Sequence, residues 1–307
     1  MTNTRTSRGG VVAAVDGTEQ GYAAAGYAAR EAGRLSLPLD VIHVFPGVGS
    51  MTTIPVEFLE TYGADIVERA RETALETVAT LDVRTHLCGG GRIQQLVDFT
   101  ENARLLVLGS RSPRSFDRIW TGGTVIGVSS RAACPVVVVP AEREPFAVHH
   151  RIVAAFKSPA HSAELFDAAF RLADELGAEL VVLHAWRLPG VYDDIIADRV
   201  DQERWRHEQT AAIERQLVDY REAFPDVQVR VYVRHENPAH ALVRTTRGAD
   251  RLLLVRPAHG GLVHHLGRTA RAVLREAHCP IEVLAPLPRG HEPTVPLVRE
   301  REGELVT

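Results

Sequence analysis

Short apolar runs alternate with longer helix-forming stretches along the chain, and the whole alternation occurs twice. The apolar runs are rich in Val, Ile and Leu, which is typical of strands buried on both faces of a parallel sheet. In the first half we predict strands at residues 11–15, 39–45, 83–87, 105–108 and 135–139, with helices at 19–33, 57–80, 93–101 and 123–132. In the second half we predict strands at residues 152–156, 179–185, 227–233, 252–255 and 281–284.

Landmarks of the first half recur in the same order in the second half. His43 and His184, in the second predicted strand of each half, are 141 residues apart. Cys134 and Cys279, just before the last predicted strand of each half, are 145 residues apart. Because self-similarity over such a distance indicates a duplicated unit, we predict two tandem domains, at residues 8–141 and 150–286, followed by a polar tail at 287–307.

Alternating strands and helices predict βαβ crossovers and an open, doubly wound parallel sheet of the flavodoxin-like kind in each half. Such sheets bind ligands beyond the carboxyl ends of their strands, where the strand order reverses. Asp16 and Gly17 follow the first strand, Gly109 follows the fourth, and Gly122 and Gly123 open the last helix. Glycines and a helix N-terminus suit a phosphate, and a carboxylate suits ribose hydroxyls. The alternative interpretation is that these residues are ordinary turn and helix-start residues.

A longer motif gives these glycines a family context. The chain resembles the universal stress protein family in its tandem two-domain form, through the VVAAVDGT start, the LDVIHVF second strand and the LLVLGSR and CPVVVV segments. ATP-binding members of that family carry the motif G-x2-G-x9-G-[ST]. Here Gly109, Ser112, Gly122 and Gly123 stand at its four defined positions, so that Ser112 replaces a glycine and Gly123 replaces the hydroxyl residue.

The resemblance implies an adenine nucleotide alpha hydrolase-like fold and a set of contacts to ATP. It implies that Asp16, with Gly17 beside it, meets the ribose or phosphates and that the Val41 backbone meets adenine. It implies that the ribose and phosphates are wrapped by Gly109, Ser112, Gly122, Gly123 and Thr124, with Mg²⁺ as a companion of the nucleotide.

The second half departs from this pattern. Lys157 stands where Asp16 stood, and aligning the apolar runs at residues 105 and 252 puts Arg256 where Gly109 stood. Arg268 follows Gly267 where the family has a small hydroxyl residue. We therefore expect a retained fold with a lost ATP site, and the alternative is a different anion pocket formed by Lys157, Arg256 and Arg268.

The last strand of each half is a predicted sheet edge, and an edge invites pairing with another strand. The resemblance implies that these two strands pair antiparallel, which makes the two halves an internal pseudo-twofold dimer. It leaves open a homodimer of whole chains and a protein partner that the sequence does not identify.

Composition and missing motifs exclude several classes of function. A net charge of −4 over 307 residues lacks the basic surface that nucleic acid demands, and no apolar run is long enough for a membrane span. We find no signal-peptide core, so we expect a cytoplasmic protein with reduced thiols. Lys157 is the only lysine, which excludes a Walker A loop. His235 and His240 are five residues apart, so they do not form a helical zinc pair, and we expect no metal site.

Buried roles are expected for most of the remaining candidate side chains. We expect Cys134 and Cys279 to be buried and Cys88 to be the accessible thiol, and we expect His43 and His184 to be satisfied core histidines. The predicted function is ATP or adenine-nucleotide binding by the first domain of a stress-response protein, with a regulatory or signalling role and no catalytic one. The alternatives are a scaffold of the same fold that binds no nucleotide, and a slow nucleotide hydrolase.

Overall fold

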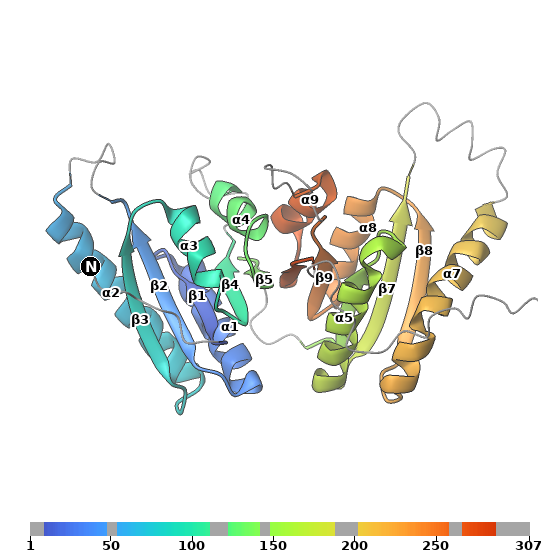
Figure 1. Ribbon diagram of the computed structural model, residues 1–307, viewed down its shortest axis with the longest axis horizontal. Coiled ribbons are helices and arrows are strands. Elements are labelled where there is room, and N and C mark those ends of the chain that lie inside the picture. The colour runs from blue at the N-terminus through green and yellow to red at the C-terminus, as the bar shows by residue number, and fades with distance from the viewer. Residues whose placement is uncertain are drawn as a thin grey trace, which may run out of the picture.

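A single mixed sheet runs through both halves of the chain (Figure 1). The computed structural model describes residues 9–47, 54–110, 122–141, 148–187, 202–257 and 266–286, and these contain ten strands. The strands are β1 (Val11–Ala14), β2 (Leu39–Phe45), β3 (Val83–Gly89), β4 (Leu105–Gly109), β5 (Val136–Val139), β6 (Arg151–Ala155), β7 (Glu179–Trp186), β8 (Val229–His235), β9 (Arg251–Val255) and β10 (Ile281–Leu284).

The strand order is β3-β2-β1-β4-β5-β10-β9-β6-β7-β8. All neighbours within each half are parallel, and β5 and β10 pair antiparallel in the middle of the sheet. The predicted doubly wound flavodoxin-like fold and the predicted pairing of the two last strands are both confirmed. We call β1–β5 with their helices the first repeat, and β6–β10 with theirs the second repeat. The order reverses between β1 and β4 and between β6 and β9.

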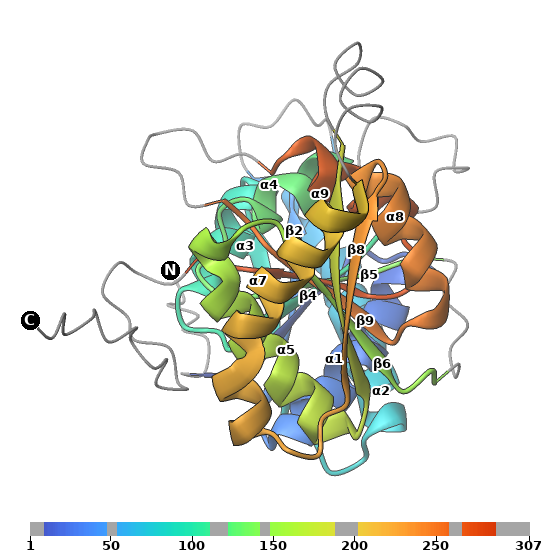
Figure 2. The ribbon, with the colours of Figure 1, turned by 90° about the vertical axis from the view of Figure 1, so that its right-hand side faces the viewer.

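Helices cover both faces of this sheet, and Figure 2 shows α5 and α7 on one side of the second repeat and α8 on the other. The α-helices are α1 (Glu19–Leu35), α2 (Val56–Thr77), α3 (Arg92–Thr100), α4 (Gly122–Ser129), α5 (Ser162–Leu176), α7 (Gln202–Ala223), α8 (Pro238–Thr245) and α9 (Arg268–Glu276), and two 3₁₀ turns, η1 (Pro159–His161) and η2 (Thr246–Gly248), complete the described elements. Within the described ranges, each helix is too short or too polar to cross a bilayer.

The sequence explains how α1 begins and ends. Thr18 precedes the helix in an extended conformation, and its hydroxyl accepts a hydrogen bond from the Gly21 N–H at 3.2 Å, as an N-cap does. Small alanines along one face then allow close packing on β1 and β2. Ser36 ends the helix with a φ of 54°, which is the left-handed conformation of a helix C-terminus.

The core is divided by the sheet. The apolar residues between the sheet and helices α1 and α2 all belong to the first repeat, and those between the sheet and helices α5 and α7 all belong to the second repeat. On the opposite face one continuous apolar cluster runs from Leu96 and Val128 in the first repeat to Leu242 and Val273 in the second. The two repeats therefore share part of their core, besides the strand pairing between β5 and β10.

Most predicted elements lie within one or two residues of the observed ones. The strand predicted at 227–233 is observed at Val229–His235. The domain limits at 8–141 and 150–286 stay predictions, and the tail at 287–307 lies outside the described residues.

Candidate functional site

A cleft opens at the carboxyl ends of β1, β2 and β4, at the point where the strand order of the first repeat reverses. It is lined by Ala14, Val15, Asp16, Thr18, Gln20, Gly21, Ile42, Val44, Arg92, Leu96, Leu108, Gly109, Thr124 and Val125. The cleft is open to solvent on one side, and its volume is about 60 Å³. Because that is room for a few water molecules only, a larger ligand would lie across the open mouth of the cleft.

Asp16 is held at the start of α1. Its Oδ1 accepts hydrogen bonds from the Thr18 hydroxyl at 2.6 Å and from the Thr18 N–H at 3.2 Å. Asp16 is exposed and lines the cleft, so its carboxylate is available to a ligand at the positive end of the helix dipole.

Gly109 lets the end of β4 approach the start of α1 closely. A Cβ atom at this position would lie 2.6 Å from the Gln20 carbonyl oxygen and 3.3 Å from the Gly21 nitrogen. Only glycine fits such a contact without a shift of the backbone. The two elements that carry Gly109 and Thr18 therefore form one wall of the cleft.

The other glycines differ in what they do. Gly17 adopts a φ of +82°, and a Cβ there would lie 2.9 Å from the Ile66 side chain, so this glycine is required by the turn between β1 and α1. Gly122 is the first residue of α4, and Gly123 is exposed with open space where a Cβ would stand. Thr124 lines the cleft, and Ser112 lies outside the described residues.

Among the predicted site residues that the structure describes, Gly17, Gly123 and Val41 do not line the cleft. For Val41 the resemblance implies a contact of its backbone, not of its side chain. Val41 is fully buried in the middle of β2, between Ala13 and Thr85 of the neighbouring strands. Its neighbours Ile42 and Val44 line the cleft instead, because successive residues of a strand point to opposite faces.

Arg92 adds a positive charge to the cleft, and the sequence did not identify it as a candidate site residue. It is the first residue of α3, and among the described lining residues it is the only cation. A cation beside a helix N-terminus suits phosphate oxygens. The signal that could have found it is its place just after the Gly89-Gly90-Gly91 run, at the carboxyl end of β3.

His43 and His184 are structural, as predicted. His43 Nδ1 lies 2.8 Å from the Val15 carbonyl oxygen, and His184 Nδ1 lies 3.1 Å from that of Phe156, so each ring donates to the end of its neighbouring strand. Burial lowers the pKa of His43, and the nearby Arg92 charge lowers it further. A neutral His43 therefore supports the β1 end that carries Asp16.

The described residues contain no group of three His, Cys, Asp or Glu side chains arranged to hold a metal ion. Asp16 is the one carboxylate among the described residues that line the cleft. Since Mg²⁺ prefers several oxygen ligands, it would fit here only with Asp16 and with the phosphates of a bound nucleotide together.

The second repeat differs from the first at Asp16, where it has Lys157, and at Gly109, where the strand register corrects the sequence alignment by one residue. Leu252 of β9 lies beside Ile281 as Leu106 of β4 lies beside Val136. Val255, and not Arg256, therefore occupies the position of Gly109, and a valine side chain stands where the first repeat has no room for one carbon.

Arg256, one residue of the alternative anion pocket, is directed at the first repeat. Arg256 Nη2 donates to the Ala132 carbonyl oxygen of the first repeat at 2.7 Å. Lys157 and Arg268 are both exposed, whereas Arg256 is half-buried. The guanidinium serves the contact between the repeats instead.

Comparison with known proteins now identifies the family. The model of the universal stress protein family matches residues 9–140 and 149–284, which are most of both repeats. The chain belongs to the universal stress protein family. Each repeat carries one copy of the family's domain.

Relatives of similar architecture cover almost the whole chain. The universal stress protein Rv2005c of Mycobacterium tuberculosis is 29% identical over 293 residues, which are 89% of this chain and 96% of that protein. The universal stress protein Rv1996 of the same species is 26% identical, over 94% and 97% of the two chains. The crystal structure of a universal stress protein from Archaeoglobus fulgidus covers 91% of this chain with a TM-score of 0.65 and 16% identity, which shows the same fold.

Proposed function

We propose that the first repeat binds ATP or a related adenine nucleotide across the mouth of the cleft, and that this binding serves a regulatory or signalling role in the cytoplasm. The observation that carries the proposal is the convergence of an exposed carboxylate, a close-packed glycine and a cation at one end of the sheet. Asp16, Gly109 and Arg92 come from three different elements and line the same cleft.

Each part of a nucleotide has a counterpart in this arrangement. The Asp16 carboxylate is placed to accept hydrogen bonds from ribose hydroxyls. The phosphates would lie near Arg92 and the first turn of α4, with contacts from Gly122, Gly123 and Thr124, and Ser112 completes this set in our proposal. An adenine ring would pack on Ile42 and Val44, beside the Val41 backbone that the family resemblance assigns to it.

A binding role is favoured over catalysis by the side chains around the cleft. Asp16 Oδ1 already accepts two hydrogen bonds from Thr18, and the described lining residues include no histidine or second carboxylate that could activate a water molecule. We therefore expect ATP turnover far below about 1 s⁻¹, the low end of ordinary enzymes.

A titration of the full chain with ATP tests the proposal, and calorimetry gives both affinity and stoichiometry. We expect one nucleotide per chain. Asp16→Ala removes a charged hydrogen-bond acceptor and should weaken binding by about 10-fold to 100-fold. Lys157→Ala is the matched control, because Lys157 holds the same position in the second repeat, and it should leave the affinity unchanged. Equal affinities of the two variants would refute the assigned site.

The second candidate function is a scaffold of the same fold that binds no nucleotide. The small volume of the cleft, about 60 Å³, favours it. The same titration separates the two candidates, because a scaffold would give no heat of binding even at millimolar ATP, where any biologically useful ATP site would be occupied.

A further inference from the structure

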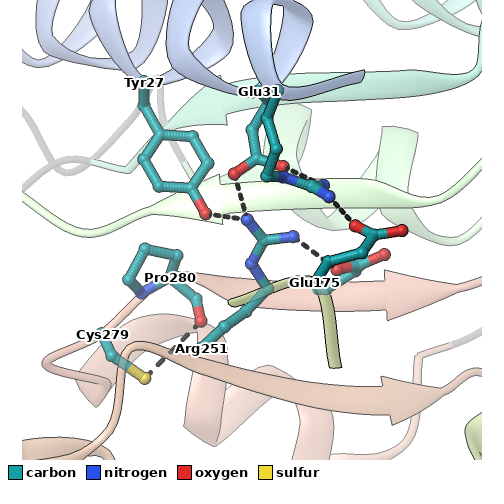
Figure 3. Close-up of polar contacts among 8 residues, drawn as sticks. Tyr27, Glu31, Glu175, Arg251, Cys279 and Pro280 are labelled. Carbon is teal, nitrogen blue, oxygen red and sulfur yellow. Dashed lines mark hydrogen bonds and ion pairs between the residues drawn. The ribbon is translucent and has the colours of Figure 1, made fainter. Parts of the chain in front are cut away.

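A buried ionic cluster joins the two repeats beside β5 and β10 (Figure 3). Arg251, the first residue of β9, is 4% exposed and donates to Glu282 of its own repeat at 2.9 Å. The same guanidinium donates to Glu31 of α1 at 2.5 Å and to the Tyr27 hydroxyl. The first repeat therefore supplies two of the three partners of a charge that the second repeat buries.

The cluster continues outward along the contact between the repeats. Glu31 also accepts a hydrogen bond from Arg34 at 2.8 Å, and Arg34 forms an ion pair with Glu175 of α5. Burial alone would raise the pKa of Glu31, but the Arg251 and Arg34 charges hold it below its ordinary value. Charges of opposite sign thus alternate across the contact, beside a cavity of about 470 Å³.

The pseudo-twofold relation brings equivalent positions of the two repeats face to face. Val137 of β5 lies opposite Glu282 of β10, and each is the second residue of its strand. Arg34 and Glu175 hold the same position in α1 and α5, since both lie two residues before the left-handed residue that follows the helix. At both places the two equivalent residues differ in charge.

The pseudo-twofold axis also relates two further parts of the contact between the repeats, one on each side of the axis. These two parts differ in polarity. By strand register and helix position, the counterparts of Arg251, Tyr27 and Glu31 are Leu105, Ala168 and Leu172. All three counterparts are apolar and line the same cavity. One side of the contact is therefore ionic and the related side is apolar.

A second contact is one-sided in the same way. Arg256 donates to the Ala132 carbonyl oxygen of the first repeat at 2.7 Å. Its counterpart by register is Ser110, because the N–H groups of these two residues bond to Val139 and Leu284, which are themselves equivalent. A serine side chain is too short to make the reciprocal contact.

Pairing of a repeat with a copy of itself would therefore bring together groups that do not match. In a pair of second repeats, Glu282 would face Glu282 and Glu175 would face Glu175. In a pair of first repeats, Arg34 would face Arg34, and the carboxylate of Glu31 would face Leu105. Like charges opposite one another and buried charges without a partner are both destabilising.

We propose that the face of the second repeat around β10 recognises a first-repeat face and rejects a copy of itself. Its fitting partner is the first repeat of the same chain or, by exchange of repeats, the first repeat of a second copy of this chain. The specificity lies in Arg251, Glu282 and Glu175 on one repeat and in Tyr27, Glu31 and Arg34 on the other. Nucleotide binding is not required for this proposal.

The first experiment replaces residues on the ionic side of the contact between the repeats by the apolar residues of the related side. The full chain carrying Glu31→Leu, Arg251→Leu and Glu282→Val together receives the residues of the related positions. Buried ion pairs exchanged for apolar residues often leave stability unchanged, so this variant should stay folded but lose the buried part of the recognition, with only Arg34 and Glu175 left to oppose the pairing of like repeats. After refolding from urea, light scattering should show at least about tenfold more dimer and larger species than for the unaltered chain. A mass distribution equal to that of the unaltered chain would overturn the proposal.

The second experiment uses milder changes and does not depend on the triple variant folding. Arg34→Glu and Glu175→Arg each place like charges at one pair. When the two chains are refolded together, exchange of repeats restores both pairs, so the dimer fraction should exceed that of either chain alone by about threefold or more. The matched control is the single chain with both changes, which keeps the ion pair between the repeats and, like the mixture, loses the hydrogen bond from Arg34 to Glu31. Its dimer fraction should be as low as that of the unaltered chain. Equal dimer fractions in the mixture and in the separate chains would contradict the proposed recognition.

Discussion

Gly109 and Gly123 were both predicted to approach the phosphates, yet the structure assigns them opposite responses to an added methyl group. In Gly109→Ala the new Cβ would lie 2.6 Å from the Gln20 carbonyl oxygen and 2.9 Å from its carbon. The end of β4 and the start of α1 must then separate by roughly 0.8 Å to reach an ordinary van der Waals contact. Strain of this kind costs about 1–3 kcal/mol, and the stiffer unfolded chain offsets roughly 0.4–1 kcal/mol of it.

Gly123→Ala is the matched control. None of the described residues has an atom within 4 Å of its added Cβ, and position 123 is inside α4. Because glycine disfavours a helix, the alanine should raise the free energy of unfolding by up to about 1 kcal/mol.

Urea unfolding of the full chain measures both effects. With a slope of about 2–3 kcal/mol per molar urea, Gly109→Ala should lower the midpoint by roughly 0.3–1 M, and Gly123→Ala should raise it slightly. Since the Gly109 change also moves the N-terminus of α1, it should weaken ATP binding in parallel. A midpoint for Gly109→Ala at or above that of Gly123→Ala would refute the close-approach argument.

Further measurements address the thiols and the response to pH. With a thiol reagent at pH 8, the folded chain should react at half-buried Cys88 only and the urea-unfolded chain at all three cysteines, because burial raises the pKa of Cys134 to about 12 and Cys279 is also buried. The lowered pKa of His43 means that the unfolded state binds the proton first, so stability should fall as the pH drops below 6.5. His43→Asn keeps a donor near the Nδ1 position and should flatten this dependence in unfolding curves measured from pH 5 to 8. The lowered pKa of Glu31 contributes stability that is present above its ordinary value of 4.5 and is lost below it, so Glu31→Gln should be less stable at pH 7 and decline less steeply in acid.

The fold was predictable because its signals are local and occur twice. A strand that is apolar on both faces predicts a parallel sheet, whatever position that strand has in the sheet. The duplication then provides an internal check, because each element of one repeat has a counterpart in the other. The pairing of β5 with β10 followed from the family resemblance, since the sequence pattern predicts an edge strand but does not identify its neighbour.

The candidate site was predictable only where a residue follows directly from a strand end. Asp16 and Gly109 meet that condition, and both line the cleft. Thr124, in the first turn of α4, also lines it, and its prediction came from the family motif. The apolar wall of the cleft shows the limit, because a shift of one residue along β2 decides whether a side chain faces α1, as Val41 does, or the cleft, as Ile42 does. Arg92 was missed because it belongs to a helix whose approach to β1 depends on the packing of the whole repeat.

The two ways of aligning the repeats differ by one residue at the end of β9, and this difference changes the role assigned to Arg256. Aligned by apolar runs, Arg256 replaces the glycine of the cleft and suggests an altered ligand site. Aligned by strand register, Val255 fills that position, and Arg256 reaches the Ala132 carbonyl of the first repeat. Arg251 at the other end of β9 also turns to the first repeat. Both ends of one strand thus carry long cationic side chains directed at the neighbouring repeat. The first repeat has Leu105 and Ser110 at these two positions, so β9 differs from β4 most where it contacts the other repeat, and the valine in place of the cleft glycine lies directly beside one of these contacts.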